Sequence, residues 1–178
     1  MSALKLPAAA LVAGLSTVAT AQDSSDLARH IVNDPSNPQV TGAAARLVDD
    51  SAVKGGKALR IQVSRKGQNP WDATVGGPVL KPVKAGDKLI LIFQAKLEHG
   101  DKGATTATLP YNAVQLAAAP YTNVISNSAD IGPDWKTIQV EGKADKDYPA
   151  KALKVTIQLA TARQIVQFGP IVLLDMGQ

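Results

Sequence analysis

Carboxylate and histidine side chains are the groups in this chain that could perform acid–base or nucleophilic chemistry. Glycoside hydrolysis needs two carboxyl groups facing each other across a cleft, yet the sequence has only two glutamates, Glu98 and Glu141, and its aspartates cluster in turns. A Ser-His-Asp triad would use His30 or His99, and no strand–Ser–helix elbow precedes either. These two histidines stand far apart in the chain and predict no zinc site. The sequence therefore predicts a protein that is not an enzyme.

A small polysaccharide lyase is the enzymatic alternative that the residues leave open. It requires a Tyr or His base and an Arg or Gln that neutralises a uronate, and His99, Tyr111, Tyr121 and Gln158 are of those types. Their spacing gives no sign that they converge. A lyase or hydrolase is accordingly kept as the second hypothesis.

Length and charge narrow the class of protein. A chain of 178 residues without cysteine is long enough to bury a core without disulfides. The formal net charge of +4 is spread along the chain, with no block of Lys and Arg. This distribution predicts no nucleic-acid partner, and we expect a monomer.

The N-terminus has the pattern of an export signal. Lys5 precedes an apolar run over residues 6–18, and Ala19-Thr20-Ala21 follows as a small-x-small cleavage site. The apolar run is too short for a membrane span. We expect residues 1–21 to be a signal peptide and the protein to be secreted, either extracellular or periplasmic.

The remaining chain predicts an all-β fold. Apolar and polar residues alternate over 59–64, 135–142 and 153–159, and residues 89–97 are strongly apolar. Eight or nine short strands with turn signals between them are typical of a sandwich or barrel. We expect residues 22–42 to be an extended lead-in or edge strand and residues 43–178 to form the sandwich. Pro110 should interrupt a strand, and residues 120–134 should form a long loop.

Several of these segments resemble the carbohydrate-binding modules of the family 4/9/22 type. The resemblance covers roughly residues 50–178 and is carried by the following segments: Gly55–Arg60, Asn69–Asp72, Val83–Leu89, Asp134–Lys136, Gln164 and Gly169–Asp175. It implies a galactose-binding-like jelly roll, a β-sandwich of two antiparallel sheets. It also implies that the partner is a polysaccharide or oligosaccharide, as for modules attached to xylanases and related glycoside hydrolases.

The resemblance also bears on metal binding. The family often opens with an Asn-Gly-Asp-Phe-Glu-like element of a structural calcium site, and residues 30–45 contain no clear equivalent. Asp175 matches the acidic position in the family's last strand, so it is the candidate ligand of a structural calcium ion. We expect no cofactor to be required. The family frequently has Gln three residues after the Trp, where this chain has Thr74.

Sugar recognition needs an aromatic platform and side chains that both donate and accept hydrogen bonds. Trp71 and Tyr121 are the candidate platforms, and Gln94, Gln158 and Gln164 are the candidate hydrogen-bonding groups. The structural alternatives are that Trp71 closes one end of the sandwich and that the glutamines are solvated on the other sheet. Tyr111 and Tyr148 lie beside prolines and are expected to pack in turns.

The hypothesis from sequence is a secreted, non-catalytic module that binds a plant or microbial glycan through the concave face of one sheet. The third hypothesis, after the lyase or hydrolase, is a cell-surface interaction module without a sugar ligand.

Overall fold

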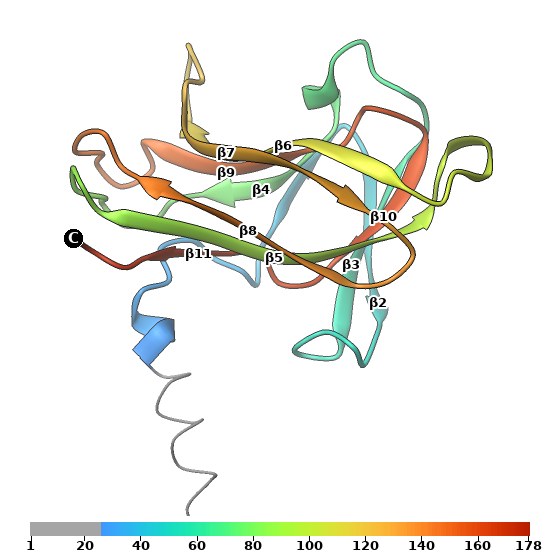
Figure 1. Cartoon of the computed structure of the whole chain (residues 1–178), viewed down its shortest axis with the longest axis horizontal. Coiled ribbons are helices and arrows are strands. Elements are labelled where there is room, and N and C mark those ends of the chain that lie inside the picture. Colours follow the sequence, from blue (N-terminus) through green and yellow to red (C-terminus); the bar gives the residue numbers. More distant parts are fainter. Residues whose placement is uncertain (1–25) are drawn as a thin grey trace, which may run out of the picture.

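The computed structural model describes residues 26–178, which form two antiparallel sheets packed face to face (Figure 1). The five-stranded sheet has the order β1-β4-β9-β6-β7, with these bounds: β1 Gln39–Thr41, β4 Thr74–Pro78, β9 Leu153–Gln158, β6 Ala107–Leu116 and β7 Asn123–Ile131. The six-stranded sheet runs β11-β5-β10-β3-β2 with β8 also paired to β5: β11 Val172–Asp175, β5 Lys88–His99, β10 Gln164–Phe168, β3 Lys57–Val63, β2 Ala44–Asp49 and β8 Lys136–Lys143. The predicted jelly-roll β-sandwich is confirmed.

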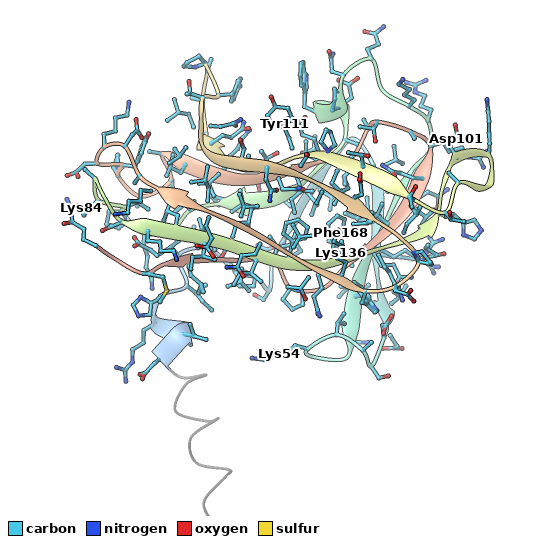
Figure 2. All side chains as sticks on the ribbon, in the orientation of Figure 1. Lys54, Lys84, Asp101, Tyr111, Lys136 and Phe168 are labelled. Carbon is cyan, nitrogen blue, oxygen red and sulfur yellow. The ribbon has the colours of Figure 1, made fainter. Side chains whose placement is uncertain are left out.

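The core lies between the sheets and follows from period-two alternation. Every second residue of β5, from Leu89 to Leu97, is buried, while the residues between them face outward. Leu153, Val155 and Ile157 of β9 supply the facing layer. Phe93 and Phe168 pack with ring centroids 6.0 Å apart, and Figure 2 shows Phe168 between the layers. Burial of these side chains is the main stabilising contribution to such a fold.

Two segments differ from the sequence expectation. Pro110 does not divide two strands: β6 continues through it, and the register with β7 shifts between Leu109 and Asn112. Such an irregularity is where a strand tolerates proline, which has no amide donor. Residues 123–131, expected within a loop, form β7. This strand was not predicted because its sequence is polar. The sequence is polar because β7 is an edge strand whose outward residues are solvated.

The outer face of the six-stranded sheet carries polar networks. Glu98 accepts two hydrogen bonds from the Arg60 guanidinium, at 2.8 and 2.9 Å. Lys96 donates to Asp50 at 2.7 Å, and the Trp135 indole N–H donates to the same carboxylate at 3.2 Å. The Lys96 ammonium lies 4.6 Å from the centroid of the Trp135 ring. Trp135 is thus a packing residue of this face.

The N-terminal part of the described chain is a short helical segment, 26–29, followed by a bridge from Ile31 to Leu174 of β11. β1 then pairs with β4 at the edge of the five-stranded sheet. The predicted signal peptide, residues 1–21, lies outside the described residues. Within residues 26–178, no helix has the length and apolar character needed to cross a bilayer.

Two short 3-10 helices complete the fold, η1 at Pro70–Asp72 and η2 at Asp101–Gly103. The η1 segment and the β6–β7 loop rise above the same side of the five-stranded sheet, at opposite ends of it (Figure 1, green at upper right and gold at upper left). These two segments bound the candidate site.

Candidate functional site

A groove of about 600 Å³ crosses the outer face of the five-stranded sheet. All five strands of the sheet and the two raised segments supply its walls and floor. The lining residues are Thr41, Trp71, Thr74, Tyr111, Gln115, Pro120, Tyr121, Asn123, Lys154, Thr156 and Gln158. A groove of this size with mixed aromatic and polar walls has the composition of a small-molecule or oligosaccharide site.

The groove gathers the exposed aromatic side chains. Trp71 is 59% exposed, Tyr111 45% and Tyr121 52%, and all three line the groove. The other aromatic residues are Phe93, Phe168 and Tyr148, which are buried, and the partly buried Trp135. Figure 2 shows Tyr111 on the outer side of the five-stranded sheet. Exposed aromatic rings that gather in one groove are typical of ligand-binding and interaction surfaces.

The Trp71 turn is held firmly although its ring is exposed. Asp72 accepts the Asn69 N–H through its carboxylate at 3.0 Å and donates its own N–H to the Asn69 carbonyl at 3.1 Å. The Pro70 carbonyl accepts the Ala160 N–H at 3.0 Å, which ties the turn to the end of β9. Proline within this turn fixes the backbone further. The ring is therefore presented by a preorganised segment.

Tyr121 is presented with backbone strain. Its φ of 57° lies in the left-handed region, where a bulky side chain is costly. The Tyr121 N–H donates to the Ala118 carbonyl at 3.0 Å, and the Leu116 N–H donates to the Thr122 carbonyl at 2.9 Å, closing the loop. Strain of this kind persists where the surrounding structure imposes it, commonly at ligand-binding sites.

The floor of the groove is the outward row of β9, formed by Lys154, Thr156 and Gln158. This strand pairs on one side with β4 and on the other with β6, so its side chains stand at the centre of the sheet. Gln158 is opposite Thr74 and is only 8% exposed, yet its Oε1 has no hydrogen-bond partner within the described residues. A buried acceptor without a partner is costly, and here it lies beside the space a ligand would fill.

The structure brings together three of the five residues that the sequence proposed as ligand-binding: Trp71, Tyr121 and Gln158. Gln94 lies on the outward face of β5 in the other sheet, so it cannot share one ligand with Gln158. Gln164 is 2% exposed and donates from Nε2 to the Leu159 carbonyl at 2.6 Å, inside the sandwich. Alternation along a strand predicts which side chains point outward. It does not predict to which of the two sheets the strand belongs.

Tyr111 and Gln115 also line the groove, outside the five residues that the sequence proposed as ligand-binding. Tyr111 was expected to pack in a turn beside Pro110, whereas it lies within β6 with its ring exposed in the groove. Tyr148 does pack in a turn as expected: it is buried, and its hydroxyl donates to Asp145. Burial raises the pKa of Tyr148 to about 12, and the Asp145 hydrogen bond adds to the shift. Only a strand assignment across Pro110 would have identified Tyr111.

The two glutamates lie away from the groove. No Asp, Glu or His occurs among the described residues that line it. Glu98 is on the outer face of the six-stranded sheet, where the hydrogen bonds from Arg60 lower its pKa. Glu141 is on that sheet too, and its hydrogen bond from Lys88 lowers its pKa. The described residues that line the groove thus include no pair of carboxyl groups for glycoside hydrolysis.

Asp175, the candidate calcium ligand, ends β11 far from the groove. Burial raises its pKa, with a further contribution from the neighbouring Asp87. Its Oδ1 accepts the Gly177 N–H at 3.0 Å, and Asp87 Oδ2 accepts the Lys84 N–H at 2.7 Å. Within residues 26–178 no three His, Cys, Asp or Glu side chains gather as a metal site. Calcium takes six to eight oxygens, so these side chains alone do not make up a calcium site, and calcium at Asp175 stays a prediction.

Solved structures with the same fold include carbohydrate-binding modules. A CBM4 domain is 16% identical with a TM-score of 0.60, covering 79% of this chain and 96% of that domain. The N-terminal cellulose-binding domain of β-1,4-glucanase C from Cellulomonas fimi is 17% identical with a TM-score of 0.59, covering 83% and 93%. A CBM22 xylan-binding domain from Paenibacillus barcinonensis is 11% identical with a TM-score of 0.57, covering 84% and 93%.

At these identities the likeness establishes the fold, and it confirms the resemblance in fold to modules of the 4/9/22 type. No protein-family model matches the sequence, and the search of curated proteins finds no match.

Proposed function

We propose that this protein is a secreted, non-catalytic polysaccharide-binding module whose ligand lies in the groove across β1, β4, β9, β6 and β7. The observation that carries the proposal is the convergence of Trp71, Tyr111 and Tyr121, the exposed aromatic residues of the described chain, on one groove. Structures of the same fold include cellulose-binding and xylan-binding domains, which supports a β-1,4-linked glycan as the ligand class.

The chemistry of the groove matches a chain of pyranose rings. The aromatic rings would stack on the apolar C–H faces of sugar residues, and the preorganised Trp71 turn lowers the entropic cost of binding. Gln115, Asn123 and Gln158 offer amides that donate and accept hydrogen bonds to hydroxyl groups. The absence of Asp, Glu and His among the described lining residues favours binding over hydrolysis.

The test is isothermal titration of the purified mature chain with soluble β-1,4-linked glucan and xylan oligosaccharides, with product analysis on the same samples. Trp71→Ala and Tyr121→Ala should each weaken affinity by about tenfold or more, as for aromatic anchors at other interfaces. Gln158→Ala should also weaken it. Gln94→Ala is the matched control, because Gln94 is an outward amide of the other sheet and should leave affinity unchanged.

Each contrary result has a distinct meaning. Normal binding by the Trp71, Tyr121 and Gln158 variants would show that the groove is not the site. Release of shortened or unsaturated sugars would replace the proposal with the lyase or hydrolase hypothesis. Failure to bind any glycan would leave the interaction-module hypothesis.

A further inference from the structure

The described lining residues of the groove include one positively charged side chain, Lys154, and no negatively charged one. Lys154 is the first residue of the outward row of β9, the central strand of the sheet. Its side chain is partly buried, and its ammonium lies 4.8 Å from the centroid of the Tyr121 ring. A cation–π contact of this kind holds the charge beside the face on which a sugar would stack.

Lys154 has no acidic partner in the part of the chain that the structure describes. The ion pairs of residues 26–178 involve Arg29, Lys57, Arg60, Lys84, Lys88 and Lys96. A module for neutral sugars gains little from an unpaired ammonium at this position, because a stacked ligand would cover the charge and displace its water. Covering a charge without a counter-charge is unfavourable.

We propose that the groove prefers an anionic glycan, in which a uronate carboxylate of the bound chain pairs with Lys154 beside Tyr121. A carboxylate is a stronger acceptor than a hydroxyl, and hydrogen bonds between charged partners are shorter and stronger than neutral ones. The absence of Asp and Glu from the described lining residues removes the repulsion that such a ligand would otherwise meet. This inference rests on the proposed function and specifies the class of polysaccharide.

The test compares two forms of one polymer, a β-1,4-linked xylan bearing glucuronate groups and the same xylan after chemical reduction of its carboxyl groups. The wild-type protein should bind the carboxylated form about tenfold more tightly, which corresponds to one charge-assisted interaction. Lys154→Met removes the charge and keeps the apolar stem. This variant should bind the carboxylated and the reduced polymer with equal affinity.

Lys143→Met is the control, because Lys143 is an exposed lysine at the end of β8 in the other sheet. It lowers the net charge equally and should keep the preference for the carboxylated polymer. Raising NaCl should reduce that preference in the wild type and have little effect on binding of the reduced polymer.

Two outcomes would overturn the inference while leaving the proposed function intact: equal binding of both polymers by the wild type, and a preference that survives in Lys154→Met. A preference lost equally in Lys143→Met would show a general charge effect and would also overturn it. Binding of neither xylan nor any neutral glycan would instead overturn the proposed function.

Discussion

A Cβ atom on Gly42 would lie 1.7 Å from the carbonyl oxygen of Asp72. Gly42 follows β1 with a φ of 70°, in the left-handed region that favours glycine. Asp72 ends the turn that presents Trp71. The missing side chain at Gly42 therefore allows the edge strand and the Trp71 turn to approach closely, and it couples backbone packing to the position of a groove residue.

Gly42→Ala is expected to destabilise the fold and to weaken glycan binding, because the clash must displace the Trp71 turn. Gly56→Ala is the matched control: its φ is 69°, and no heavy atom lies within 4 Å of the site a Cβ would occupy. The control should cost about 1–2 kcal/mol from the left-handed backbone alone, with unchanged binding. Urea unfolding and titration of both variants measure the two effects. Equal losses of stability, with normal binding by both, would contradict the argument.

Replacing Gln158 by Met should increase the stability of the fold and weaken glycan binding. The substitution removes a buried oxygen without a partner and keeps the side-chain volume, so stability should rise by about 1 kcal/mol while glycan affinity falls. Gln164→Met is the comparison, since the Oε1 of Gln164 is also unpartnered but its Nε2 donates to the Leu159 carbonyl. That variant leaves a carbonyl unpaired and should lose stability while its binding stays normal. Thermal unfolding and titration separate the two cases.

Glu98 should contribute to stability only when ionised. Its pKa is lowered, chiefly by the Arg60 hydrogen bond, so this contribution is present above the pKa of an unfolded glutamate and is lost as pH falls through the folded-state pKa. Glu98→Gln should cost about 1 kcal/mol at pH 7, less than a fully buried pair, since both side chains retain contact with water.

The cost of Glu98→Gln should vanish in acid, which chemical unfolding across a pH series would show. Glu141→Gln, on the more exposed Lys88 pair, should have a much smaller effect at neutral pH. Glycan binding should be normal in both variants, because both residues lie on the sheet away from the groove. A pH-independent loss in Glu98→Gln would refute the electrostatic explanation.

Asp175 should have the opposite pH dependence. Burial raises its pKa, so its contribution is complete below the unfolded-state pKa and is lost as pH rises through the folded-state pKa. Asp175→Asn is therefore expected to raise Tm at pH 7, by about 2–4 °C for each kcal/mol gained, and to have no effect in acid. Asp147→Asn should lower Tm at pH 7, because the Ala85 N–H and Lys84 lower the pKa of Asp147.

The same proteins test the calcium prediction. If Asp175 helps to hold Ca²⁺, added Ca²⁺ should raise the Tm of the wild type at neutral pH and leave Asp175→Asn unchanged. Equal responses of the two proteins to Ca²⁺ would exclude Asp175 as a ligand.

Strands with clean alternation were predictable from the sequence. The residues of β3, β8 and β9 carry period-two patterns because one face of each is buried against the other sheet, and a strongly apolar run predicted β5. β7 was taken for a loop, since its Asn, Ser and Asp residues have low strand propensity and its pairing with β6 supplies the order. The local pattern of apolar and polar residues indicates which side chains of a strand are buried. Which strands pair with one another depends on contacts between residues distant in sequence.

Trp71, Tyr121 and Gln158 were selected from sequence by residue type, because few side chains can stack on or hydrogen-bond to a sugar. The all-β class, the alternation of the main strands and this short set of candidates all follow from residue types and their spacing. The three-dimensional structure was needed to show that Gln94 and Gln158 belong to different sheets and that Tyr111 joins the groove. It was also needed to show that Lys154 contacts the Tyr121 ring and has no acidic partner among residues 26–178. The period-two alternation of apolar and polar residues indicates which side chains face outward. The pairing of strands distant in sequence decides which of these outward side chains lie on the same surface.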